Sequence, residues 1–285
     1  MLHLPEIANS TDPLHTIRDL YLSLLARSLT NEIYREAEVS IQPAAPIGFL
    51  RRRVHRAILA RGLQVVRVTP IDRSACTEGR AWPAFAHTMI GAGRLINLRA
   101  CVEDVLRSEI PGDLIETGVW RGGACILMRA ILKAYGISDR KVWVADSFAG
   151  LPPPSPGRFP ADAGDTHHLH KQLAVSLEEV KGNFERYGLL DDQVHFLRGW
   201  FRDTLPSAAI TKLAVLRLDG DMYESTMDSL ESLYPKLSAG GYLIVDDFGA
   251  IPSCRQAVHD YRAAHGITEP IREIDWTGVY WQRLR

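Results

Sequence analysis

From about residue 81 onward, short apolar runs alternate with longer segments whose apolar residues recur at helical spacing. The short runs predict strands and the longer segments predict helices, because side chains repeat every 2 residues in a strand and every 3.6 in a helix. The predicted strands are residues 113–117, 141–146, 193–199, 212–219 and 241–247, followed by two candidates at 271–275 and 278–283. The predicted helices are residues 122–136, 175–188, 225–237 and 253–265. This alternation indicates an α/β fold with a mainly parallel sheet and helices on both faces.

The first 80 residues follow a different pattern. Residues 14–31 predict an amphipathic helix, because their apolar positions have helical spacing. We expect a loop at residues 39–48, whose two prolines provide no backbone donor. The basic run Arg51–Arg53 could bind an anion, but we interpret it as the solvated face of a helix. The chain is therefore expected to combine an N-terminal helical region, residues 1–80, with a domain over residues 81–285.

Composition excludes several classes of protein. The 285 residues are 46% hydrophobic, which suits a packed core, and 33 Lys and Arg nearly balance 34 Asp and Glu. A nucleic-acid-binding protein normally carries a basic excess, so we do not expect nucleic acid as a partner. No apolar run approaches the ~20 residues of a membrane helix, and the N-terminus lacks a secretory signal pattern. The four cysteines form no CxxC pair, so we expect reduced thiols in a cytoplasmic protein.

Residues that follow the predicted strands are the candidates for function, because ligands of such sheets bind beyond the carboxyl ends of the strands. The turn from Glu116 to Gly123 contains glycines that would let a ligand approach the backbone. Trp120 stands where a GxGxxG motif has its second glycine, which weakens a dinucleotide interpretation and leaves open a turn without a ligand. Asp146 ends the next strand and either binds ribose hydroxyls or caps a helix.

Two further segments carry possible ligand contacts. Gly199, Trp200 and Phe201 follow the third strand, where the rings would either line an adenine pocket or belong to the core. The segment 148–170 is a long loop rich in Pro and Gly, which is typical of functional or mobile loops. Its histidines could bind a metal, close over a substrate or simply be exposed; they are His167, His168 and His170.

Four aspartates at two successive strand ends give the strongest chemical signal. Asp219 and Asp221 end one predicted strand, and Asp246 and Asp247 end the next. If the strands are neighbours, the carboxylates converge and need a cation or protons to offset their repulsion. Asp219 and Asp221 would point the same way on an extended backbone, whereas a turn is needed for both Asp246 and Asp247 to bind. Oxygen ligands favour Mg²⁺, with Mn²⁺ or Ca²⁺ possible, and the alternative is a solvated rim of helix caps and salt bridges.

Long motifs give the chain a resemblance to the macrocin O-methyltransferase family (TylF/MycF type). They are ETGVWRGG at 116–123, DSFAGLP at 146–152, residues 175–206, LRLDGDMYEST at 216–226 and GGYLIVDDFG at 240–249, with additional matches at 28–34 and 86–99. The resemblance implies the class I methyltransferase fold, a Rossmann-like sheet of seven strands with the last antiparallel. It also implies an N-terminal helical lid that covers the site, and a homo-oligomer.

The same resemblance implies an S-adenosylmethionine-dependent, Mg²⁺-dependent enzyme that methylates a sugar hydroxyl of a glycosylated natural product or glycolipid. It places the metal on Asp219, Asp246 and Asp247, with Asp219 also near the cofactor, and makes Asp221 the general base. The remaining cofactor contacts that it implies are Glu116, Gly118 and Trp120 on the methionine side, Asp146 on the ribose, Ser147, Gly199 and Trp200 at the adenine end, and Thr88, Met89 and Ile90 near the carboxylate. One departure is Ile96, where the family often has Asp.

The chemistry agrees with that assignment. A sugar hydroxyl is a weak acid, and a Lewis-acidic Mg²⁺ beside a carboxylate base would favour its deprotonation. Three alternatives remain at this stage: a catechol-type O-methyltransferase, an NAD-dependent oxidoreductase, and a protein that binds S-adenosylmethionine without catalysis. The missing GxGxxG motif argues against the second, and the complete set of four aspartates argues against the third.

Overall fold

A seven-stranded sheet forms the centre of the protein in the computed structural model, which describes residues 13–34, 39–43, 49–63, 66–70 and 72–284. The strands are β3 (Asp113–Thr117), β4 (Val142–Asp146), β5 (Val194–Arg198), β6 (Leu213–Leu218), β7 (Leu237–Val245), β8 (Arg272–Glu273) and β9 (Val279–Gln282). Their order across the sheet is β5-β4-β3-β6-β7-β9-β8. The first five in this order are parallel, and β9 is antiparallel to both β7 and β8. The prediction of a mainly parallel sheet is confirmed.

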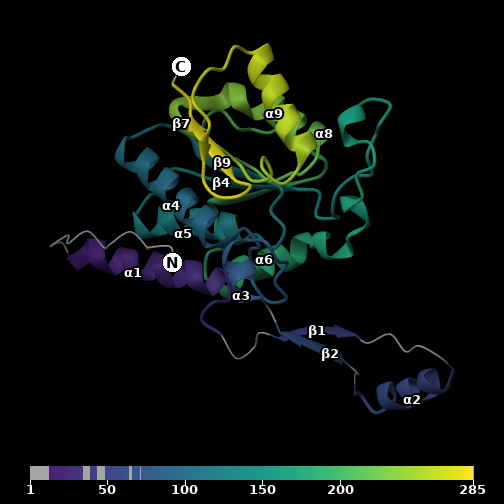
Figure 1. The fold of residues 1–285 in the computed structure, drawn as a ribbon. Coiled ribbons are helices and arrows are strands. Elements are labelled where there is room, and N and C mark those ends of the chain that lie inside the picture. Colours follow the sequence, from purple (N-terminus) through teal and green to yellow (C-terminus); the bar gives the residue numbers. More distant parts are fainter. Residues whose placement is uncertain (1–12, 35–38, 44–48, 64–65, 71, 285) are drawn as a thin grey trace.

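Helices cover both faces of this sheet (Figure 1). One face carries α4 (Gly91–Arg107), α5 (Gly123–Ala134) and α6 (Leu177–Arg186), and the other carries α7 (Phe201–Thr204), α8 (Tyr223–Leu233) and α9 (Pro252–Ala264). The strands alternate between two cores: Leu114 packs with α4 and α5, whereas its neighbour Ile115 packs with α8 and α9. This alternation follows from the period of two in a strand. Helix α4 was not among the predicted elements, and the predicted helix at 225–237 ends earlier because β7 already begins at Leu237.

The register of the parallel strands brings their carboxyl ends to one edge. Thr117 pairs with Leu218, and Leu218 in turn pairs with Val245. The ladder continues for one more residue on two strands, because the Asp219 N–H donates to Thr117 and the Asp246 N–H donates to Leu218. The strands carrying the two aspartate pairs are therefore neighbours, as the sequence analysis required.

The N-terminal region contains more than helices. Helix α1 (Pro13–Leu29) packs against α4 and α5, whereas α2 (Phe49–Leu59) projects from the body together with a two-stranded antiparallel ribbon (Figure 1). The ribbon pairs β1 (Val39–Pro43) with β2 (Val66–Pro70), so the prediction of a loop was wrong at 39–43; its remainder, 44–48, lies outside the described residues. A proline is tolerated here because Pro43 occupies the last position of an edge strand.

Arg52 and Arg53 are exposed on α2, as expected for a solvated helix face, while the side chain of Arg51 lies outside the described part. A short helix, α3 (Arg73–Thr77), leads into the main domain. The four cysteines are all free thiols. Within the described ranges, no helix has the length and apolar character needed to span a membrane.

Candidate active site

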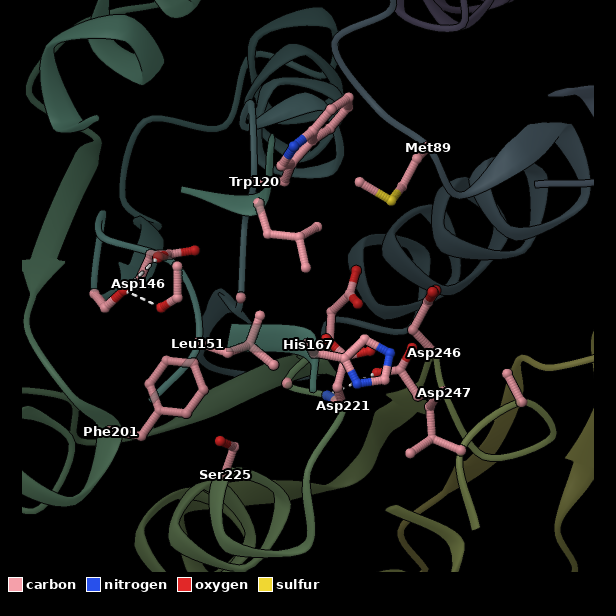
Figure 2. A pocket seen from close by; sticks show the side chains of 18 of the residues that line it. Met89, Trp120, Asp146, Leu151, His167, Phe201, Asp221, Ser225, Asp246 and Asp247 are labelled. Carbon is pink, nitrogen blue, oxygen red and sulfur yellow. Dashed lines mark hydrogen bonds between the residues drawn. The ribbon is translucent and has the colours of Figure 1, made fainter. Parts of the chain in front are cut away.

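A pocket lies at the carboxyl edge of the sheet (Figure 2). Asp146 lies on one side of it, the aspartates that follow β6 and β7 lie on the other, and Met89 and Trp120 border it between them. The predicted site residues that line this pocket are Met89, Gly118, Trp120, Asp146, Ser147, Gly199, Trp200, Asp219, Asp221, Asp246 and Asp247. The fold thus brings together most of the candidates from six separate segments.

Three predicted cofactor residues lie outside the pocket wall. Ile90 is buried in the core, and Thr88 is also buried, with its hydroxyl accepting the Ile90 N–H at 3.4 Å. Glu116 is 2% exposed and lies behind the wall, where its carboxylate accepts a hydrogen bond from the Cys125 thiol at 3.0 Å. Ile96, the departure from the family pattern, is 40% exposed on α4 and does not border the pocket.

The chain leaves three strands through unusual backbone conformations. Trp120, Phe148 and Asp221 have positive φ angles of 48°, 55° and 58°, a region that residues other than glycine rarely adopt. Gly118, at φ 87°, approaches β6 so closely that an added Cβ would lie 1.7 Å from the Asp219 carbonyl oxygen. Backbone strain of this kind is concentrated at functional sites, where the surrounding structure stabilises it.

The Asp146 side chain connects the turns that follow β3 and β4. One carboxylate oxygen accepts the Val119 N–H at 2.8 Å, and the other accepts the Phe148 N–H at 2.7 Å. Burial raises the pKa of Asp146, while these backbone donors oppose that rise. Each carboxylate oxygen has two lone pairs, so this structural role leaves capacity for a ligand hydroxyl in the pocket.

Asp219, Asp246 and Asp247 form a compact acidic cluster. Each offers one carboxylate oxygen, and these oxygens all lie within 4.8 Å of one another. The chain bends directly after β7, which allows both Asp246 and Asp247 to face the pocket, as expected. The condition under which Asp219 and Asp221 would point the same way, an extended backbone between them, is not met. The chain turns there instead, with Asp221 at positive φ and its N–H donating to the Asp247 carboxylate at 3.0 Å.

Two buried arginines bind the cluster, and sequence reasoning missed both. Arg217 on β6 is 1% exposed; its Nη1 contacts Glu116 and also donates to Asp219 at 2.7 Å, while its Nη2 contacts Asp246. Arg94 on α4 contacts the other Asp246 oxygen. The available signal was the charge of Arg217 within an otherwise apolar strand, because a buried charge requires a partner.

The cluster remains negative after these arginines are counted. Six carboxylates face two guanidinium groups; they belong to Glu116, Asp219, Asp221, Asp246, Asp247 and Asp275, the last of which pairs with Arg94 at 3.0 Å. Burial and mutual repulsion raise the pKa of Asp219 and Asp247 well above its usual range, and burial raises the pKa of Asp221 to about 6. Carboxylates with elevated pKa values and a shared focus fit a hard divalent cation, which would offset the excess charge.

The long loop after β4 forms another part of the wall. It contains three short 3₁₀ turns, η2 (Pro160–Asp162), η3 (His167–Leu169) and η4 (Lys171–Leu173). Its pocket-lining residues include Leu151 and His167, and the ring of His167 lies beside Asp221 (Figure 2). Of its three histidines, only His167 borders the pocket. Trp200 and Phe201 also line the pocket and are only partly buried, rather than enclosed in the core.

Comparisons with known proteins agree with this geometry. Residues 18–283 match the family described as macrocin-O-methyltransferase (TylF). The chain is 52% identical over 268 residues to the 8-demethyl-8-(2,3-dimethoxy-alpha-L-rhamnosyl)-tetracenomycin-C 4'-O-methyltransferase of Streptomyces olivaceus, covering 93% of each chain. It is 59% identical over 209 residues to the demethyldecarbamoylnovobiocin O-methyltransferase of Streptomyces niveus, covering 73% of this chain and 80% of that protein.

A solved structure shares the whole architecture. The O-methyltransferase NovP superposes with a TM-score of 0.81 at 50% identity, over 94% of this chain and 100% of that chain. The seven-stranded sheet with its antiparallel strand is that of class I S-adenosylmethionine-dependent methyltransferases. The chain belongs to the macrocin O-methyltransferase (TylF) family of S-adenosylmethionine-dependent O-methyltransferases.

Proposed function

We propose that this enzyme methylates a sugar hydroxyl of a glycosylated natural product, with Mg²⁺ held by Asp219, Asp246 and Asp247, and Asp221 as general base. The observation that carries the proposal is the acidic cluster, whose three carboxylates share a focus directly beside Asp221 in the pocket. The Streptomyces olivaceus relative is named for methyl transfer to a rhamnosyl unit, which supports a sugar as the acceptor class.

In this proposal, residues of the chain have two roles, proton transfer and positioning. When bound, Mg²⁺ supplies a Lewis acid that lowers the pKa of a nearby hydroxyl, and S-adenosylmethionine supplies the methyl group. Asp221 accepts the hydroxyl proton as the sugar oxygen attacks the methyl carbon of S-adenosylmethionine, whose carbon–sulfur bond breaks. The products are a methyl ether, S-adenosylhomocysteine and a protonated Asp221 carboxyl group. The Asp221 N–H donates to Asp247, so the backbone of the base is fixed to a proposed metal ligand. The long loop excludes water from the reaction.

Cofactor contacts are proposed for the parts of the pocket wall that lie outside the acidic cluster. Asp146 binds the ribose, Ser147, Gly199 and Trp200 lie at the adenine end, and Gly118, Trp120 and Met89 border the methionine moiety; all of them line the pocket. Glu116 acts from behind the wall through Arg217, because that arginine bridges it to Asp219. For Thr88 and Ile90 we retain a role limited to shaping the segment that carries Met89.

We also propose that the N-terminal region, residues 1–80, takes part in a homo-oligomer and that its end covers the site. Gly79, at the end of this region, already lines the pocket. Helix α1 buries one apolar face on the main domain and exposes another, composed of Leu14, Ile17, Leu20, Tyr21 and Leu24. Sedimentation equilibrium should therefore give a mass above that of one chain, and replacement of Ile17 and Leu20 with glutamate should shift it to the monomer. A wild-type monomer at micromolar concentration would contradict the proposed assembly.

The reaction itself can be tested by calorimetry and an acceptor panel. S-adenosylhomocysteine and then Mg²⁺ are titrated into the protein, after which glycosides and catechols are offered with S-adenosylmethionine. We expect cofactor binding, a separate metal-binding event and methylation of a glycoside. Cofactor binding without a metal event would reject the metal site, whereas methylation of catechols alone would replace the sugar with an aromatic acceptor.

A further inference from the structure

The loop at 148–170 is docked onto helix α8, which follows the proposed base Asp221 in the chain. Asp162 is 1% exposed, and its two carboxylate oxygens accept the N–H groups of Tyr223 and Glu224 at 2.7 and 3.0 Å. These residues form the first turn of α8, which begins two residues after Asp221 and has no side-chain cap of its own. An anionic carboxylate is stabilising at this position of a helix. The loop is therefore held in a defined position relative to Asp221.

Within this docked loop, Asp165 orients His167. One oxygen of Asp165 accepts the His167 backbone N–H at 2.9 Å, and the other lies 2.6 Å from the ring Nδ1. A carboxylate only accepts, so Nδ1 carries the proton and Nε2 is the nitrogen left for another partner. Asp165 is 10% exposed at its side chain, which shields the hydrogen bond from water. The ring thus has a fixed plane and a fixed tautomer.

His167 presents this ring to the pocket, on the side of the acidic cluster. It lines the pocket together with Asp221, and Figure 2 shows its ring in front of Asp221 and near Asp247. The other two histidines of the loop have different surroundings. His170 packs edge-on against Trp82, with ring centroids 5.1 Å apart, and His168 does not border the pocket. The contrast identifies one histidine of the three as a ligand-facing group.

We propose that His167, oriented by Asp165, is an acceptor-binding residue that hydrogen-bonds, through Nε2, the sugar oxygen next to the reacting hydroxyl. This inference rests on the proposed function, because it needs an acceptor hydroxyl at Asp221. Adjacent oxygens of a sugar ring project from neighbouring carbons, so one can meet Asp221 while the next meets His167. Neutral imidazole accepts at Nε2 from a hydroxyl, and imidazolium donates there to a hydroxyl or an ether oxygen. His167 would therefore select acceptors that carry oxygen beside the methylated position.

The test compares methyl transfer by the wild type with that of His167→Ala, His167→Gln, Asp165→Asn and His168→Ala. The acceptors are a glycoside panel that includes demethyldecarbamoylnovobiocin and 8-demethyl-8-(2,3-dimethoxy-α-L-rhamnosyl)-tetracenomycin C. We expect His167→Ala to raise the acceptor KM about tenfold, the equivalent of one hydrogen bond, with unchanged affinity for S-adenosylhomocysteine. Asp165→Asn should raise the acceptor KM by a smaller factor. His167→Gln should have a lower KM than His167→Ala, because glutamine can still form a hydrogen bond. His168→Ala is the matched control and should retain the wild-type KM.

A deoxy analogue of the accepted glycoside, lacking the neighbouring oxygen, completes the test. With this analogue, the KM of the wild type should rise about as much as the KM of His167→Ala rises with the full acceptor. The KM of His167→Ala with the analogue should be little higher than either of these two values. An equal KM for His167→Ala and His168→Ala would overturn the proposal. So would a parallel loss of S-adenosylhomocysteine affinity, which would make His167 a structural residue of the loop. If the wild type binds S-adenosylhomocysteine but methylates no glycoside, the proposed function fails first, and this inference fails with it.

Discussion

Replacement of Asp221 with asparagine lowers turnover by about 100- to 10,000-fold and leaves S-adenosylhomocysteine affinity unchanged, if Asp221 is the base. Asparagine has nearly the same shape but cannot accept the proton. It also tolerates the positive φ of 58° at this position, because Asn and Asp both enter the left-handed region more readily than other residues. The hydrogen bond to Asp247 comes from the backbone of residue 221 and is retained. Single-turnover rates and calorimetry on the same preparation provide both measurements.

The pH profile sharpens this experiment. Burial raises the pKa of Asp221 to about 6 in the metal-free protein, and a bound cation would lower it. Because the base works only when deprotonated, activity should rise with pH through a limb at or below 6. Asp228 also lines the pocket and has its pKa raised by burial to about 6, so the position of the limb alone does not identify the base. Asp228→Asn should retain that limb and most of the turnover, whereas wild-type turnover in Asp221→Asn would remove Asp221 from the mechanism.

How much of this site could be predicted depends on the kind of interaction involved. The aspartate pairs could be placed together, because parallel strands bring their carboxyl ends to one edge and hydrophobic patterns locate those ends. The position of His167 could not be predicted, because it depends on Asp162 reaching across to the first turn of α8. No periodicity encodes a contact between a loop and a helix 61 residues away.

The contacts of the two buried arginines also depend on tertiary structure that the sequence pattern does not encode. Arg94 lies on a helix that was not predicted, so its contact with Asp246 could not be anticipated. Arg217 could have been marked as a buried charge, but its choice of Glu116, Asp219 and Asp246 depends on the order of strands in the sheet. Likewise, the ribbon at Val39–Pro43 depends on pairing with a segment more than twenty residues away rather than on its own composition.

Because of these arginines, substitution of the proposed metal ligands Asp246 and Asp247 should have different effects on stability. Asp247 is 8% exposed and accepts a backbone N–H, and no arginine contact is found for it among the described residues. Asp246 is held by both Arg94 and Arg217. We expect Asp247→Asn and Asp246→Asn each to abolish the metal-binding event and to lower turnover at least 100-fold. Only Asp246→Asn should also destabilise the metal-free fold, by about 3 kcal/mol, because it leaves two buried guanidinium groups without their shared carboxylate.

The dependence on pH separates the two variants further. The folded-state pKa of Asp247 is raised by burial and by repulsion from Asp221 and Asp219, so the folded protein binds the extra proton more readily than the unfolded chain. The metal-free wild type therefore loses stability as pH rises through that pKa, and Mg²⁺ should restore it at pH 8 more than at pH 5.5. Asp247→Asn removes the repelled carboxylate, so its melting temperature without metal should equal or exceed that of the wild type at pH 8.

Thermal unfolding with and without Mg²⁺ at both pH values measures these effects. The solvent-exposed Asp203, on α7, provides the matched control: Asp203→Asn should keep the wild-type response to Mg²⁺. If Asp247→Asn retains the Mg²⁺-dependent rise in melting temperature, Asp247 is not a ligand. If both variants lose stability equally in the metal-free state, the two arginines do not provide the charge balance that separates Asp246 from Asp247. A lower melting temperature confined to Asp246→Asn would instead show that the site is preorganised before any metal binds, with Arg94 and Arg217 holding one ligand in place for the others.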